Sequence, residues 1–367
     1  MTILKKTAKM NACTYFVWEV NKITSRKEVA KLAGVSEATV SRVFNNSGPL
    51  REATKRKVLQ AAKELNYHPN AIAQSFARGK SNNIGVIVPY LPKVNLMSTY
   101  YFSELLSGIG SKLGEAGYGL LLLFQPADQP KDYVKLFLSQ RVDGCIILGS
   151  KHVPGEVEAL EKLHQLSLPY CLVNQSFAGY SFHSIDADHL DGSFQAVSSL
   201  FNKGHKQVIF LNGPMEYSNS MERLKGYEKA LANAKILFNE KLLFQGNYSR
   251  KSGFQSAMHI SSLLPDCQAI FAANDRMAIG LMQGLSALGY LAGHDYSIIG
   301  YDDSDIAKMT SPPLSTIRVP LFEMGQLAAA KVLQLTSSDD KTEIYECLPV
   351  SLIERASSLM QNKPFRR

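Results

Sequence analysis

The pattern of apolar and polar positions divides this chain of 367 residues at about residue 83. Before that point, apolar residues recur every three or four positions, as in the stripe of Val29, Ala30, Leu32 and Ala33. That spacing predicts amphipathic helices, two of them within residues 25–45 and a third at about 52–66. Beyond it, short apolar runs alternate with amphipathic stretches, which predicts strands alternating with helices.

The strands expected in the second part are continuous apolar runs, a pattern typical of parallel strands that are covered on both faces. They lie at 84–89, 120–124, 145–149, 170–174, 208–213, 242–246, 269–274, 297–302 and 315–319. Amphipathic helices are expected between them, for example at 102–116 and 276–288. The pattern predicts a doubly wound α/β fold with parallel strands, and it leaves open whether there is one sheet or two.

Residues 25–45 carry the signals of a helix-turn-helix. Ser25 and Glu28 have the spacing of a capping box, Gly34 suits the left-handed end of a helix, and Ser36 is placed to cap the second helix. The outward face of that second helix carries short or polar side chains that fit a DNA major groove. The alternative is a capped helical hairpin in an ordinary bundle.

The distribution of charge favours DNA binding over that alternative. Residues 1–80 hold 15 Lys and Arg against 5 Asp and Glu, whereas residues 81–367 hold 25 against 27. The excess positive charge therefore belongs to the helical head, as expected of a surface that neutralises phosphates.

Other classes of protein leave no signature in this sequence. Five scattered cysteines without metal-ligand spacing are typical of reduced cysteines in a cytoplasmic protein. The glycines of GIGSKLG at 108–114 have the wrong spacing for a dinucleotide-binding turn, and no apolar run is long enough to cross a bilayer. We therefore expect no catalytic residues, no metal, no cofactor and no membrane partner.

Several separated motifs resemble the lactose/galactose repressor family of bacterial transcription regulators. They follow the family's order and cover nearly everything after residue 23: KEVAKLAGVSEATVSRVFN (27–45), YHPNAIAQSFARGKSNNIGVIVP (67–89), GHKQVIFLNGP (204–214), AIFAAND (269–275), SIIGYDDSDIAKMTSPPLSTI (297–317) and LPVSLIERASS (348–358). The resemblance implies an all-α helix-turn-helix head and a hinge helix, then a two-lobed core of the periplasmic-binding-protein type with three crossovers. It also implies a cytoplasmic homodimer that binds palindromic operator DNA, most often as a repressor of carbohydrate genes, under the control of a small sugar.

The resemblance sets the expected boundaries. The helix-turn-helix domain spans 24–68, the hinge helix and linker 69–82, the two-lobed effector and dimerisation domain 83–358, and a tail 359–367. Residues 1–23 precede the usual start of the family, and we hypothesise that translation begins near Val20. The tail lacks an apolar heptad, so a coiled-coil tetramer is not expected.

The residues expected to contact DNA lie on the second helix and on the hinge helix. By the resemblance, Glu37, Ala38 and Arg42 contact bases. Their chemistry suits this role: Glu37 can accept from cytosine N4, Ala38 can contact a thymine methyl group, and Arg42 can donate two hydrogen bonds to a guanine. Phe76 stands where the family usually has the leucine that wedges into the minor groove. The full set is Ser36, Glu37, Ala38, Thr39, Ser41, Arg42, Asn45, Asn70, Ala73 and Phe76.

Four of the residues expected to bind the effector follow strand ends, where ligands of open α/β sheets bind: Asn174, Tyr248, Asn274 and Asp302. The resemblance adds the others. By the resemblance, Arg223 grips the effector, Tyr248 covers it, and Asp302 accepts from its hydroxyl groups. The full set is Tyr101, Asn174, Tyr217, Asn219, Arg223, Tyr248, Asn274 and Asp302. Asp302 has the alternative role of starting a turn, and Arg223 that of a surface ion-pair partner.

Only the charges of the residues expected in the effector site indicate what kind of molecule the effector is. Arg223 is expected beside Asp302, and no second cation is evident on the variable loop, which favours a neutral sugar. The alternatives are a sugar phosphate, a phosphorylated partner protein as co-regulator, and a pure sugar-binding receptor.

Overall fold

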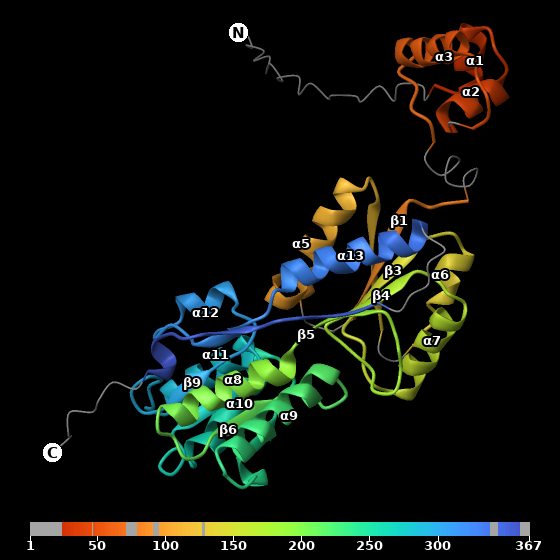
Figure 1. The fold of residues 1–367 in the computed structure, drawn as a ribbon. Helices are drawn as coiled ribbons and strands as arrows, with labels where there is room; N and C mark the ends of the chain where they lie inside the picture. Colours follow the sequence, from red (N-terminus) through yellow and green to blue (C-terminus); the bar gives the residue numbers. More distant parts are fainter. Residues whose placement is uncertain are drawn as a thin grey trace, which may run out of the picture. The chain divides into compact units, whose positions relative to one another are not determined.

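The structure, a computed structural model, describes residues 24–45, 47–70, 79–90, 95–126, 129–337 and 344–359 (Figure 1). These residues form two compact units, divided in sequence after Lys80. The predictions for residues 1–23, for Ala73 and Phe76 of the hinge helix, and for the tail beyond Leu359 lie outside the described residues.

The first unit is a bundle of three helices, α1 (Arg26–Ala33), α2 (Glu37–Asn45) and α3 (Glu52–Glu64). Ser25 and Glu28 form the predicted capping box, and Gly34 ends α1 in the left-handed conformation at φ 66°. Val29, Val40 and Val58, one from each helix, are fully buried against one another. Leu32 was expected to share that core, but it is 50% exposed, because it lies at the edge of the face that α1 buries.

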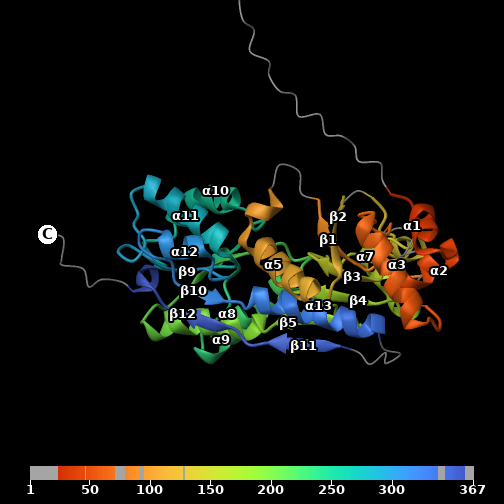
Figure 2. The same ribbon diagram turned by 90° about the horizontal axis from the view of Figure 1, so that it is seen from above.

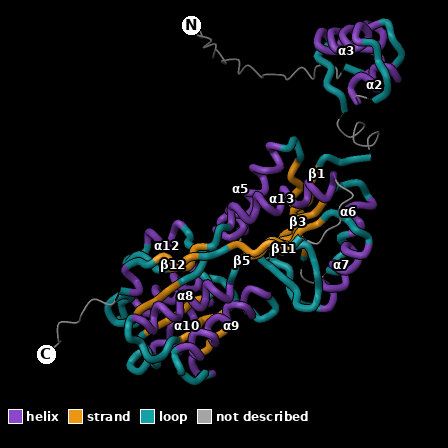
Figure 3. The backbone as a smooth tube through the Cα atoms, viewed as in Figure 1, coloured by secondary structure: helices purple, strands orange, loops and turns teal. Residues whose placement is uncertain are grey.

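The second unit has two lobes with separate parallel sheets (Figure 3). Lobe one holds a sheet in the order β11-β5-β4-β3-β1-β2. Its strands are β1 (Asn83–Pro89), β2 (Gly119–Gln125), β3 (Gly144–Leu148), β4 (Tyr170–Val173), β5 (Ser184–Ala187) and β11 (Tyr345–Leu348). Its helices are α5 (Tyr100–Glu115), α6 (Val134–Leu138), α7 (Pro154–Gln165) and α13 (Leu321–Ser337), with the 3-10 turn η1 (Leu96–Ser98) before α5.

Alternate residues of each buried strand serve opposite faces of this sheet. In β3, Ile146 belongs to the core under α5 and α13, whereas Cys145 and Ile147 belong to the core under α7. The helices α5 and α13 lie side by side on one face (Figures 1 and 2). Their close approach depends on Gly108, because a Cβ atom there would lie 2.0 Å from the carbonyl oxygen of Phe322.

Lobe two holds a sheet in the order β7-β6-β8-β9, together with an antiparallel pair, β10 and β12. Its strands are β6 (Ile209–Asn212), β7 (Leu243–Gln245), β8 (Ala269–Ala272), β9 (Ser297–Ile299), β10 (Thr316–Arg318) and β12 (Ser351–Ile353). Its helices are α8 (His189–Asn202), α9 (Ser218–Asn233), α10 (Arg250–Ser261), α11 (Asp275–Ala287) and α12 (Asp305–Met309), with 3-10 turns η2 (Glu240–Leu242) and η3 (Ala356–Ser358). The chain passes between the lobes after β5, β10 and β11, so the three expected crossovers are present.

The predicted class of fold is therefore confirmed, with two sheets where the apolar pattern had left one or two open. All nine predicted strands are present, and β5, β11 and β12 were not predicted from the sequence. In the described part of the chain, none of the helices combines the length and apolar character that crossing a membrane requires.

Candidate functional site

A cavity of about 400 Å³ lies between the two lobes, at the carboxyl ends of the strands. A volume of this size is typical of a small-molecule site. All eight residues that the sequence analysis assigned to the effector line it: Tyr101, Asn174, Tyr217, Asn219, Arg223, Tyr248, Asn274 and Asp302. The structure thus gathers them from six separate segments of the chain.

The backbone is strained where three of these residues leave their strands. Asn174 follows β4 with φ 61°, Tyr248 follows β7 with φ 64°, and Asp302 follows β9 with φ 111°. Side-chain-bearing residues avoid positive φ, and each such conformation costs on the order of 1–3 kcal/mol. Strain of this kind persists where the surrounding structure must hold a side chain in one direction, here toward the cavity.

Arg223, on α9, is a buried cation held by neutral groups. Only 3% of its surface is exposed. It donates to the hydroxyl of Tyr248 at 3.3 Å, its Nη2 lies 3.4 Å from Nδ1 of His189, and its guanidinium lies 4.1 Å from the ring centre of Tyr301. Its Nε is buried without a hydrogen-bond partner. The alternative of a surface ion-pair partner is therefore wrong for this residue.

Tyr248 covers one side of the cavity. Its ring lies over Gly213, where a Cβ atom would come within 2.1 Å of the ring. Its hydroxyl contacts that of Ser220 and donates to Oδ1 of Asn219 at 3.0 Å. Asn274 holds the Tyr248 backbone by donating to its carbonyl oxygen at 3.1 Å.

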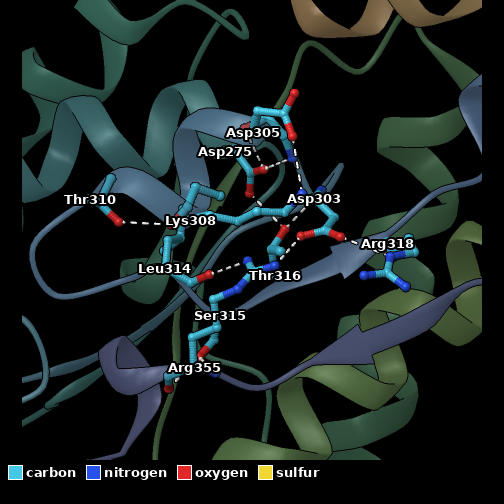
Figure 4. A network of polar contacts seen from close by, with 12 residues as sticks. Asp275, Asp303, Asp305, Lys308, Thr310, Leu314, Ser315, Thr316, Arg318 and Arg355 are labelled. Atoms are coloured by element: carbon cyan, nitrogen blue, oxygen red, sulfur yellow. Dashed lines mark hydrogen bonds and ion pairs between the residues drawn. The ribbon is translucent and has the colours of Figure 1, made fainter.

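Asn274 has a second task, since its Oδ1 caps α11 by accepting from the backbone of Met277 at 2.9 Å. The carboxylate of Asp275 accepts from Ser304 and from Thr316, and so anchors the turn that follows β9 (Figure 4).

Asp302 lies in that anchored turn and is, among the residues that the structure describes, the one carboxylate that lines the cavity. Burial and then repulsion from Asp275 raise the pKa of Asp302 well above its ordinary range, against the opposing effect of Arg223 and Arg276. The neighbouring Asp303 is paired with Arg318 at 2.8 Å and with Arg355, as Figure 4 shows. The two adjacent acids therefore have different roles: Asp303 stabilises the turn through its ion pairs, and Asp302 lines the cavity.

His189 joins the lobes behind the cavity and was not found from the sequence. Its ring contacts Oδ1 of Asn174 at 2.8 Å and the hydroxyl of Tyr301 at 3.1 Å. Burial and the nearby Arg223 lower the pKa of His189 well below its ordinary value, so the ring is neutral. One neutral ring thus links the end of β4 in lobe one to Arg223 and Tyr301 in lobe two.

Tyr101 and Tyr217 form parts of the wall. Tyr101 packs edge-on against Phe102, with ring centres 4.9 Å apart. Tyr217 lies 5.9 Å from the ring of Tyr248, and Nζ of Lys151 stands 5.4 Å from the Tyr217 ring centre.

Six polar lining residues were not in the predicted set: Thr99, Lys151, Gln175, Asn247, Ser249 and Arg276. Arg276 follows the strand-end pair Asn274-Asp275 directly, so the strand-end rule could have found it. Lys151 lies two positions past the predicted strand 145–149. The charge argument from the sequence considered only the variable loop, whereas Lys151 and Arg276 reach the cavity from other segments.

The residues expected to contact bases lie on the outward face of α2. Glu37, Ala38 and Arg42 are exposed. Glu37 pairs with Arg26 at 3.3 Å across the exposed surface of the head.

Other members of the expected DNA-binding set have local roles. Ser36 accepts from the backbone of Thr39 at 3.2 Å, so it caps α2 as the sequence predicted. Asn45 donates to Ser41 at 3.3 Å, and Asn70 is exposed.

Metal and thiol chemistry find no support in the part of the chain that the structure describes. No group of three or more His, Cys, Asp or Glu side chains gathers there as metal ligands. Cys145, Cys171 and Cys267 are buried free thiols, and Cys347 is an exposed one.

Comparisons with known proteins agree with this architecture. Residues 26–70 match the family described as bacterial regulatory proteins, lacI family, and residues 197–358 match the periplasmic binding protein-like domain. The HTH-type transcriptional regulator AscG of Escherichia coli (strain K12) is 35% identical over 320 residues, which cover 87% of this chain and 94% of that one. The HTH-type transcriptional repressor PurR of Vibrio atlanticus (strain LGP32) is 31% identical over 339 residues, which cover 90% and 97%.

Two solved structures are similar along nearly their whole length. The lac repressor dimer bound to operator and the anti-inducer ONPF matches with a TM-score of 0.80 at 30% identity, covering 92% of this chain and 100% of that one. The complex of the transcriptional regulator CelR with cellobiose matches with a TM-score of 0.69 at 26% identity, covering 91% and 99%.

Proposed function

This chain belongs to the lacI family of bacterial regulatory proteins and is a DNA-binding transcriptional regulator, and we propose that a sugar bound between its lobes controls its affinity for operator DNA. The observation that carries the proposal is the convergence of eight polar and aromatic residues, from strand ends, from α5 and from α9 with its N-cap, on one cavity. Amide and carboxylate oxygens accept from sugar hydroxyl groups, and an aromatic face such as that of Tyr248 packs on the apolar side of a pyranose. The cellobiose in the CelR complex supports a sugar as the class of ligand.

The cavity is lined by residues of both lobes, so a bound ligand can change the relative stability of different angles between the lobes. Lobe one contributes Tyr101 and Asn174, whereas lobe two contributes Arg223, Tyr248 and Asp302. A ligand that touches both sets stabilises one angle between the lobes over others. Binding energy that differs between two arrangements shifts their populations, and coupling of roughly 1–3 kcal/mol is usual.

The DNA side of the proposal assigns the exposed face of α2 to an operator's major groove. Arg42 is placed to donate two hydrogen bonds to a guanine, and Ala38 to contact a thymine methyl group. Two copies in a homodimer would read a palindromic site, because two-fold symmetry in the protein is mirrored in the DNA. Such a regulator acts in the cytoplasm, where the chromosome is.

The experiment has two measurements. Thermal unfolding is followed against a panel of mono- and oligosaccharides, since a ligand of the native state raises the midpoint in proportion to the logarithm of its concentration. Operator affinity is then measured by fluorescence anisotropy, with an operator recovered from a random duplex library, in the absence and presence of the sugar found.

Two variants separate the two sites. Arg42→Gln is expected to weaken specific operator binding by about 1–3 kcal/mol while the midpoint shift with sugar stays unchanged. Arg223→Met is expected to remove the midpoint shift with sugar while specific operator binding in the absence of sugar stays unchanged. A midpoint shift that survives in Arg223→Met would show that the sugar binds elsewhere.

A further inference from the structure

Among the residues that the structure describes, three cations and one carboxylate line the cavity. Lys151 comes from the loop after β3, Arg223 from α9 and Arg276 from the first turn of α11, while Asp302 is the carboxylate. Every other lining residue is uncharged. The lining therefore carries an excess of positive charge, which hydroxyl groups alone do not neutralise.

None of these three cations has a carboxylate oxygen within 4.0 Å among the residues the structure describes. The polar partners of Arg223 are the hydroxyl of Tyr248 and the neutral ring of His189. Arg276 reaches only the hydroxyl of Thr99, at a long 3.5 Å. Lys151 faces the ring of Tyr217.

The acids nearest to Asp302 are committed to other partners. Asp303 is neutralised by Arg318 and Arg355, and Asp275 accepts hydrogen bonds from Ser304 and Thr316 (Figure 4). Asp302 itself is held in an environment that raises its pKa. Asp302 acts electrostatically on both Arg223 and Arg276, so among the described residues one carboxylate offsets only part of three positive charges.

One buried donor of the site has no acceptor among the described residues. Arg223 is 3% exposed, it lines the cavity, and its Nε has no hydrogen-bond partner. A buried donor without a partner is costly, and a buried charge without a counter-charge more so. A bound anion removes both costs at once, whereas a neutral hydroxyl group removes only the first.

We propose that the effector is a sugar bearing an acidic group, either a phosphate ester or a carboxylate, with Arg276 as the principal partner of that group. This rests on the proposed function, because it names the class of sugar that the same cavity takes. Arg276 suits the role because its one weak contact leaves its guanidinium available for a two-pronged interaction with an acid. Lys151 adds positive charge from the opposite lobe, so the acid favours closure of the lobes.

The experiment compares matched ligands by titration calorimetry on the full chain: hexoses and cellobiose, their phosphate esters, the corresponding uronates, and inorganic phosphate alone. One acidic member is expected to bind about tenfold or more tightly than its neutral parent, since hydrogen bonds to charged groups are the stronger ones. In Arg276→Gln that ratio falls toward one, whereas Lys241→Gln, which removes an exposed cation outside the cavity lining, leaves it unchanged.

The experiment distinguishes a phosphate ester from a carboxylate. It also distinguishes failure of the acidic-sugar inference from failure of the proposed function. The acidic ligand with the highest affinity, a phosphate ester or a uronate, identifies which acidic group the site binds. A neutral parent that binds as tightly as both of its acids, or a ratio unaffected by Arg276→Gln, overturns the inference and leaves the proposed function standing. Binding of inorganic phosphate alone with no sugar of any kind overturns both.

Discussion

Replacing Arg223 by methionine is expected to abolish the response to sugar without destabilising the ligand-free protein. Met matches the length of the Arg stem and removes the charge. The side chain gives up two long hydrogen bonds to neutral partners, at 3.3 and 3.4 Å, worth about 0.5–1.5 kcal/mol each, and a contact 4.1 Å from the Tyr301 ring centre, worth about 2 kcal/mol. Against this stands the cost of several kcal/mol for burying a charge that has no carboxylate oxygen within 4.0 Å among the described residues. The two sums nearly cancel, so the free energy of unfolding should change by no more than about 1 kcal/mol.

Arg355→Met is the matched control, because it removes an arginine whose side chain is 15% exposed and which has a carboxylate partner. Arg355 pairs with Asp303 and donates to the carbonyl oxygen of Leu314 at 2.7 Å. Breaking a buried ion pair typically costs about 3–5 kcal/mol, and Arg318 at 2.8 Å retains part of the compensation here.

Urea unfolding followed by circular dichroism, at one protein concentration and without sugar, measures both variants. The expected result is a midpoint near that of the unmodified protein for Arg223→Met and a clearly lower one for Arg355→Met. Destabilisation of Arg223→Met by more than about 2 kcal/mol would refute the reasoning, because it would make Arg223 a structural rather than a ligand-binding residue.

Three further predictions concern separate parts of the molecule. Gly213→Ala should weaken sugar binding about tenfold or more in calorimetry, because its Cβ would displace the Tyr248 ring; unchanged affinity would contradict the placement of that ring. Burial raises the pKa of Asp186 to about 6, so the folded protein holds a proton that the unfolded chain has lost above its ordinary pKa of 3.8. The free energy of unfolding should therefore fall as pH rises from about 4 to about 6, and Asp186→Asn should reduce that slope; a slope equal to that of the unmodified protein would count against it. Ser25→Ala should destabilise the helical head by about 1 kcal/mol through loss of the capping box, seen in its thermal transition, without altering sugar affinity.

The sequence predicted much of the site because strand ends are readable from it. A buried parallel strand is a short apolar run, and the polar residue that ends the run marks the ligand-binding edge of the sheet. Asn174, Asn274 and Asp302 were found in this way, and all three line the cavity. The family resemblance supplied Arg223, which lies within a helix where no local signal distinguishes it from a surface arginine.

What the sequence did not reveal depends on contacts between distant segments. His189 begins a helix, and its importance comes from Asn174 and Tyr301, which are 15 and 112 positions away. The strand β5 was missed because its sequence SIDA is short and half polar, and it is buried only through its neighbours β4 and β11. The charge of the cavity was underestimated for the same reason, since Lys151 and Arg276 reach it from opposite lobes.

The most direct test of the account measures operator affinity with and without a saturating concentration of the sugar that raises the unfolding midpoint most. Fluorescence anisotropy titrations with the unmodified protein should give dissociation constants that differ by roughly fivefold or more, in either direction, and the difference should vanish in Arg223→Met. Identical operator affinities with and without the bound sugar in the unmodified protein would contradict the claim that the cavity controls DNA binding.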